Sequence, residues 1–122
     1  MDYSSPCRTA GKIGFHKHLN VARTALSIIS IGEIYEVAFA YANPQEHLAS
    51  FRQFLALFRL LTLNEPLMEQ FGEIQVLLRR LGEIISDFDI LIGATALHYD
   101  LTFLTYNTRH FKRIPHLKLY PT

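Results

Sequence analysis

Continuous apolar runs alternate along this chain with stretches whose apolar residues recur at helical spacing. Residues 25–31, ALSIISI, form one such run, rich in β-branched residues, and Gly32 interrupts it before residues 33–42 show helical spacing. Parallel strands that are covered on both faces read as continuous apolar runs. We therefore expect a buried strand over residues 25–31, followed directly by a helix.

Two longer segments with helical periodicity come next. Asn43 and Pro44 predict the start of the first helix, because Asn is a favoured N-cap and the missing N–H of Pro is harmless in the first turn. The second helix is expected to open at Pro66 and to end at Gly82. The apolar stripes of the two helices consist of Leu48, Phe51, Phe54, Leu55, Phe58 and Leu61, and of Leu67, Phe71, Ile74, Leu77, Leu78 and Leu81. The first stripe is expected to be core, with a groove or dimer face for a partner helix as the alternative.

The C-terminal part changes from helical to strand periodicity. Ser86 begins a Ser-Asp pair that predicts the cap of a helix over residues 89–99. Residues 101–106 and 116–120 predict strands, and residues 107–114 between them predict a turn or a short helix.

This order of elements predicts an α/β domain with a mostly parallel sheet. The simplest partition is one domain over residues 21–122, preceded by an atypical, poorly ordered segment over residues 1–20 that shows no hydrophobic periodicity. In the last long helix, Gly93 and Ala96 are small enough to allow close packing of a neighbouring element.

Charge and cysteine content change this picture little. The net charge of +1 excludes neither a nucleic-acid nor a protein partner, because a near-neutral total can hide local clusters. The stretch after Asp100 has basic residues and no acidic ones, which suits a polyanion. The single Cys7 forms no internal disulfide, and no apolar run approaches the roughly 20 residues that cross a bilayer. We therefore expect a cytoplasmic protein with no membrane insertion.

Three polar residues stand where ligands gather in open parallel sheets. Glu33 and Asn107 each follow a predicted strand, and Asp89 lies in the first turn of a helix. Carboxylates brought together in this way repel one another unless a cation neutralises them, and an oxygen-rich site suits Mg²⁺ or Mn²⁺. An acid at a helix N-terminus is also an ordinary dipole partner, so spacing alone leaves both interpretations open.

Two blocks of sequence resemble PIN-domain proteins of the VapC toxin type. The block SIISIGEIYEV is similar to the segment that carries the second conserved acid of the family, which would be Glu33. The block DFDILIGATALHYDLTFLTYNTRHFKRIPHLKLY resembles the C-terminal half of such a toxin. In it, Asp89 matches the third acid, and Thr105 with Asn107 matches a Thr-x-Asn motif.

This resemblance, which covers residues 24–120, implies a PIN-like three-layer α/β/α fold. It also implies a metal-dependent endoribonuclease that cleaves RNA phosphodiesters with Mg²⁺ (or Mn²⁺), usually as the toxin of a toxin–antitoxin pair. Asp89 would be a direct metal ligand, and Glu33 would hold the metal or orient the attacking water. Thr105 and Asn107 would position ligands or phosphate oxygens. RNA is the implied substrate, an antitoxin protein the implied partner, and a homodimer the expected assembly.

Several neighbouring residues have both a functional and an ordinary interpretation. Arg109, Lys112 and Arg113 are candidates for contacts to RNA phosphates, or a solvated basic turn. His110 is a candidate for approaching the phosphate, or a packing residue. Asp87 is expected to cap its helix rather than to bind metal, because residues two apart on a helix point in different directions. An unrelated α/β regulator with an acidic pocket ranks last, since no strand precedes these acids.

The family pattern is broken at the front of the chain. No apolar strand ending in Asp-Thr-Asn precedes Leu26, so the first strand and the first acid are missing from the pattern. Asp2 is a poor replacement because no apolar strand leads into it, and His16 with His18 predicts an exposed tail rather than a zinc site. Either the natural start lies elsewhere, through a wrong start or a frameshift, or the chain is a decayed copy. In the second case it would be a catalytically inactive PIN-like protein that engages an antitoxin or another partner.

Overall fold

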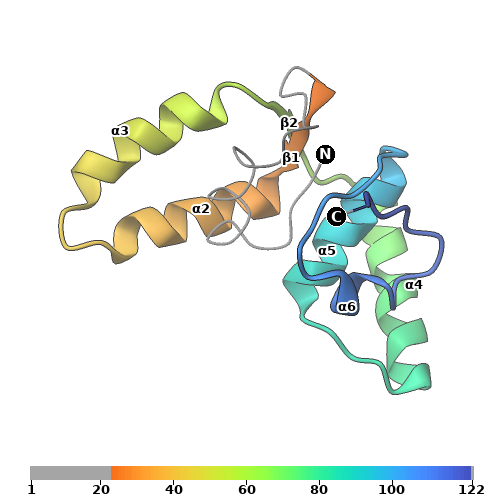
Figure 1. Ribbon diagram of the computed structural model, residues 1–122. Helices are drawn as coiled ribbons and strands as arrows, with labels where there is room; N and C mark the ends of the chain where they lie inside the picture. The colour runs from red at the N-terminus through yellow and green to blue at the C-terminus, as the bar shows by residue number, and fades with distance from the viewer. Residues whose placement is uncertain (1–22, 122) are drawn as a thin grey trace.

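The computed structural model describes residues 23–121 (Figure 1). The atypical N-terminal segment 1–20, with Asp2, Cys7, His16 and His18, lies outside these residues. The described elements are β1 (Ala25–Ser27), α2 (Ile28–Ala40), α3 (Pro44–Leu55), β2 (Arg59–Leu61), α4 (Glu65–Leu81), α5 (Asp87–His98) and α6 (Thr108–Phe111). None of the helices within residues 23–121 is long and apolar enough to cross a membrane. The predicted α/β class is confirmed.

The first strand is shorter than predicted, because the helix after it begins earlier. The Ser27 side chain accepts a hydrogen bond from the Ser30 backbone N–H at 3.1 Å, which caps α2 at its N-terminus. Ser30, Ile34 and Ala38, four residues apart, then form the buried face of α2. The strand prediction for residues 28–31 is therefore wrong: the cap and the buried face outweigh the strand propensity of the β-branched isoleucines.

The helix predicted to reach Leu61 ends at Leu55, and the residues after it form a strand. In β2, residues 59–61 pair in parallel with residues 25–27 of β1, so that Leu60 lies opposite Leu26. Periodicity alone does not separate a short apolar strand from the end of a helix. The ladder of backbone hydrogen bonds to β1, a distant partner in sequence, decides the conformation here.

The next two helices follow the local signals closely. Asn64 accepts a hydrogen bond from the Leu67 N–H at 2.9 Å, so α4 begins at Glu65, one residue before the predicted Pro66. Gly82 ends α4 with a φ of +69°, in the left-handed region that favours glycine. Ser86 is the N-cap of α5. Gly82 confirms the predicted end of α4, and Ser86 confirms the predicted cap of α5, although α5 spans Asp87–His98 rather than residues 89–99.

The two C-terminal strands are reduced to a single parallel bridge between Phe103 and Leu119. The predicted turn or short helix between them is confirmed as α6. The sheet is therefore small within the described residues, and helices contribute most of the packing. In Figure 1, α2 and α3 form a hairpin, whereas α4, α5 and α6 gather with the C-terminal segment on the other side of the strands.

The main core lies between α4, α5 and the C-terminal segment. Its fully buried residues include Leu67, Leu78, Ile90, Phe103 and Phe111. Gly93 allows the close approach expected from the sequence, because a Cβ there would lie 2.5 Å from Ile114 Cδ1. The last turns of α4 are less covered than the sequence indicated, since Leu77 and Leu81 of the predicted stripe are exposed.

A charged pair joins the turn after α5 to the C-terminal segment. Lys118 Nζ donates a hydrogen bond to Asp100 Oδ1 at 2.9 Å, and this bond, together with the lysine charge, lowers the pKa of Asp100. A carboxyl with a lowered pKa in the folded state adds stability above its ordinary pKa, and loses it as the pH falls through the folded value. Replacing Lys118 with Met should therefore raise the pKa of Asp100, measured by carboxyl carbon NMR across an acid titration. An unchanged pKa in that variant would contradict the pairing.

Candidate metal and RNA site

Asp89 stands in the first turn of α5, where the local structure orients it. The Ser86 hydroxyl accepts a hydrogen bond from the Asp89 backbone N–H at 3.2 Å. The Asp89 side chain is only 13% exposed. Asp87, two residues earlier, instead accepts a hydrogen bond from Gln75 Nε2 of α4 at 2.6 Å. The two acids therefore have different surroundings, as their spacing predicted, although the cap itself is Ser86.

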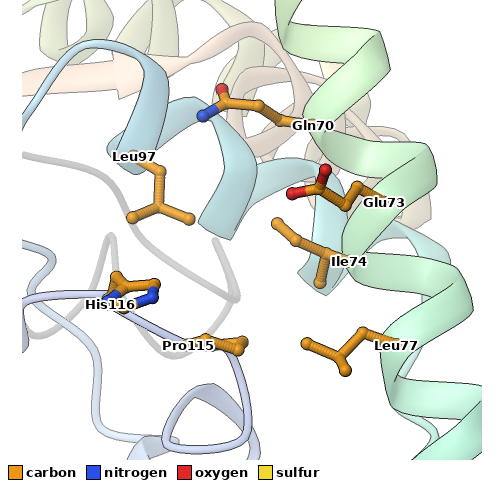
Figure 2. Close-up of a pocket in the computed structure, with 7 residues that line it drawn as sticks. All are labelled: Gln70, Glu73, Ile74, Leu77, Leu97, Pro115 and His116. Atoms are coloured by element: carbon orange, nitrogen blue, oxygen red, sulfur yellow. The ribbon is translucent and has the colours of Figure 1, made fainter.

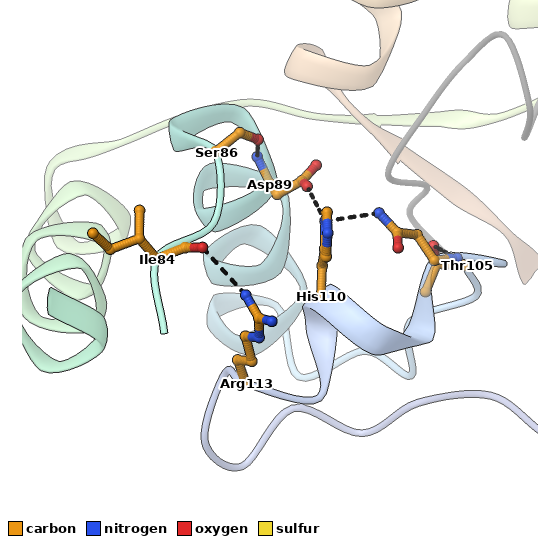
Figure 3. Close-up of polar contacts among 7 residues, drawn as sticks. Ile84, Ser86, Asp89, Thr105, His110 and Arg113 are labelled. Carbon is orange, nitrogen blue, oxygen red and sulfur yellow. Dashed lines mark hydrogen bonds and ion pairs between the residues drawn. The ribbon is translucent and has the colours of Figure 1, made fainter. Parts of the chain in front are cut away.

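His110 links Asp89 to the turn that follows the Phe103 bridge (Figure 3). Its Nδ1 lies 3.5 Å from Asp89 Oδ2 and 3.0 Å from Asn107 Nδ2. The imidazole Nδ1 either carries a proton, which suits the carboxylate, or offers a lone pair, which suits an amide N–H. His110 therefore has a role in the site that the sequence left undecided between phosphate contact and packing.

Thr105 stabilises this turn from its buried side. Its side chain is buried, and its Oγ1 accepts a hydrogen bond from the Asn107 backbone N–H at 3.0 Å. The threonine thus positions Asn107, which is partly buried and contacts His110. The side chain of Asn107 contacts His110, which in turn contacts Asp89.

Glu33 reaches the same region from α2, which packs against α5. Its Oε1 atom is buried. Glu33 lines a hollow of about 400 Å³ together with Phe88, the residue that precedes Asp89. The structure therefore brings Glu33 to the first turn of α5.

The predicted basic residues differ in their surroundings. Arg109 and Lys112 are exposed. Arg113 is partly buried, and its Nη1 donates a hydrogen bond to the Ile84 carbonyl at 3.2 Å (Figure 3). Arg109 and Lys112 are thus the more available cations on the segment that carries His110.

The donor atoms of this region fit a hard divalent cation. Residues 23–121 contain no group of three or more His, Cys, Asp or Glu side chains placed to hold a metal ion. Mg²⁺, however, is usually bound through one or two carboxylates, with water and substrate phosphates completing its shell. Asp89, Glu33 and Asn107 offer carboxylate and amide oxygens of this kind, so the residues present fit Mg²⁺ or Mn²⁺.

A second hollow, of about 280 Å³, lies between α4, the end of α5 and the C-terminal segment (Figure 2). Glu73 on α4 and His116 on the C-terminal segment are its charged or titratable residues, and Ile74, Leu77 and Leu97 give it apolar walls. It contains one carboxylate, and Asp89 and His110 do not line it. It is therefore separate from the candidate site.

Phe88 and Glu36 are the lining residues that the sequence interpretation missed. Both line the hollow beside Glu33. Phe88 occurs between two acids and is 53% exposed, whereas half of the residues of α5 are buried. The signal available in the sequence for Phe88 was an aromatic residue between two acids at the start of a helix.

Comparisons with known proteins identify a family and several relatives. The family model for the PIN domain matches residues 14–117. Ribonuclease VapC2 of Haemophilus influenzae is 28% identical over 95 residues, which cover 78% of this chain and 72% of the relative. The tRNA(fMet)-specific endonuclease VapC of Salmonella typhimurium is 28% identical over 102 residues, covering 84% and 77%.

Comparison with solved structures gives a similar result. A solved structure of DNA-bound VapBC from Salmonella typhimurium superposes with a TM-score of 0.87 at 25% identity. The match covers 98% of this chain and 95% of the solved one. The match of the family model over most of the chain shows that the chain belongs to the PIN-domain family.

Proposed function

We propose that this chain is a divalent-metal-dependent endoribonuclease of the VapC type that cleaves RNA phosphodiesters. The observation that carries the proposal is the set of contacts joining Asp89, at the start of α5, to Asn107 through His110. A carboxylate and an amide from separate segments contact the same imidazole at a helix N-terminus, a place that favours anions such as phosphate. The VapC names of the curated relatives support the same activity.

Each residue of the site then has a distinct task. Asp89 and Glu33 would hold Mg²⁺ or Mn²⁺, which when bound polarises a phosphate oxygen and lowers the pKa of water. Asn107 would orient a ligand or phosphate oxygen, and Thr105 would hold the turn that presents Asn107. His110 would keep the Asp89 carboxylate in place. Arg109 and Lys112, both exposed, would contact RNA phosphates next to the site.

The proposed partners follow from the relatives. The solved Salmonella typhimurium structure is a VapBC complex bound to DNA, which supports a cognate antitoxin as a partner of this chain. A homodimer and a cytoplasmic location remain predictions from the sequence.

Removal of the metal tests the activity directly. The purified chain should cleave tRNA or total RNA in Mg²⁺, and EDTA should reduce the rate by at least about a hundredfold, since the metal supplies most of the charge stabilisation. Gel electrophoresis of labelled RNA gives the rate, and calorimetry of Mg²⁺ binding gives a second readout without RNA. Cleavage that persists in EDTA would contradict the proposal. If the chain shows no cleavage and no Mg²⁺ binding, this result favours the catalytically inactive binding protein instead.

A further inference from the structure

The hollow lined by Glu33 has features that have no role in the proposed metal site. Its walls come from the first three turns of α2 and from Phe88 in the first turn of α5. Phe88 and Ile28, on its apolar wall, are 53% and 37% exposed. A Cβ on Gly32 would meet no atom within 4 Å, so the space above this glycine is open. The hollow is therefore an apolar recess with an accessible aromatic ring and two carboxylates.

RNA chemistry suggests the occupant. If Glu33 and Asp89 hold a metal on an RNA phosphate, the nucleobase of that nucleotide lies one ribose away from the phosphate, and therefore close to the residues around the metal. Proteins that recognise single-stranded RNA stack the bases on aromatic side chains. The Glu36 carboxylate repels a second phosphate from the hollow, whereas it does not repel a neutral, flat base. The hollow thus has a suitable place for a base beside the scissile phosphate.

Glu36 limits which base is favoured. An ionised carboxylate only accepts hydrogen bonds, so it selects a base edge with donors. Guanine presents two adjacent donors, N1–H and the N2 amino group, which match the two carboxylate oxygens. Adenine and cytosine place a ring nitrogen acceptor beside their single amino group, and uracil has one N–H between two carbonyls. A carboxylate at this wall therefore discriminates in favour of guanine.

We propose that this hollow is a guanine subsite next to the scissile phosphate, with Phe88 stacking on the base and Glu36 accepting from its Watson–Crick edge. This inference rests on the proposed ribonuclease function. Glu33, one helical turn before Glu36, remains with the metal. The two acids of α2 thus have separate tasks, one for the phosphate and one for the base.

The test measures RNA binding rather than cleavage. Labelled oligouridylates that carry one central guanosine, inosine or adenosine are titrated with the full chain in Ca²⁺, which slows cleavage, and fluorescence anisotropy gives Kd. The guanosine RNA should bind about tenfold more tightly than the adenosine RNA, the scale of one bidentate contact to a base. Inosine keeps N1–H but lacks the amino group, so its affinity should lie between the two.

Variants separate the contributions. Glu36→Ala should abolish the guanosine preference, whereas Glu46→Ala, at an exposed acid in the first turn of α3, should preserve it. Phe88→Ala should weaken binding of all three RNAs by about tenfold, as loss of base stacking does. Gly32→Leu should fill the hollow and remove the preference without removing a contacting side chain. Circular dichroism shows that each variant is folded.

Each result supports or overturns the inference. RNA binding without a base preference, or a preference that survives both Glu36→Ala and Gly32→Leu, overturns the guanine subsite and leaves the ribonuclease proposal standing. The hollow would then belong to a side chain of a partner protein. No RNA binding by the unaltered chain overturns both proposals.

Discussion

Replacing Asp89 with Asn should reduce Mg²⁺-dependent RNA cleavage by at least about a hundredfold, because even the loss of an outer-shell partner of a metal ligand costs 10–100-fold. Asn has nearly the same shape as Asp but lacks the negative charge that attracts a cation. The Ser86 hydroxyl bonds to the backbone N–H of this residue and does not depend on the side chain. The loss should therefore appear in the rate and in the calorimetric Mg²⁺ affinity, with the fold retained.

Asp87 provides a matched control in the same helical turn. Its carboxylate accepts from Gln75, and Asn at this position keeps an oxygen that can do the same. Asp87→Asn should therefore leave the cleavage rate and the Mg²⁺ affinity within about threefold of those of the unaltered chain, since only a surface interaction changes. If both variants lose activity equally, the effect is the general charge of the helix N-terminus, and the assignment of Asp89 as a ligand is wrong.

Replacing Phe111 with Ala should lower the free energy of unfolding by about 3–5 kcal/mol, the usual cost of removing a buried phenylalanine ring. Phe111 is 0% exposed and packs on Phe103, with ring centroids 4.5 Å apart. Small domains have only about 5–15 kcal/mol of stability in total. Urea unfolding followed by circular dichroism measures the change.

The Phe111→Ala substitution should also affect the candidate site. Phe111 follows His110, so the buried ring connects α6 to the core that carries α5. We expect the variant to lose RNA cleavage at urea concentrations that leave the unaltered chain active. Phe39→Ala is the control, because Phe39 is 61% exposed and its truncation should change stability by less than about 0.5 kcal/mol. An equal loss of stability in both variants would contradict the core assignment of Phe111.

The ends of several helices were predictable from short stretches of sequence. Gly82 and Ser86 act through hydrogen bonds or backbone conformations within about four residues of themselves, so their effect does not depend on the rest of the fold. Ser27 has the same kind of effect, but its signal was hidden by the apolar run around it. The error at residues 28–31 is therefore one of interpretation rather than of missing information.

The small sheet was not predictable in the same way. Strand β2 exists because residues 59–61 meet β1, and the final strands are reduced to one bridge between Phe103 and Leu119. Strand formation depends on a partner that is distant in sequence, and the apolar pattern does not say which segments meet.

The candidate site also combines residues that the sequence predicted with contacts that only the tertiary structure decided. The sequence by itself indicated Glu33, Asp89, Thr105 and Asn107, because a family resemblance and the position of each residue at the end of an element are local properties. Only the tertiary structure placed His110 between Asp89 and Asn107, buried Thr105 beneath the turn, and set Phe88 and Glu36 around one hollow. Asp89 and His110 are 21 residues apart, and α5 and α6 must pack on a common core before their side chains meet.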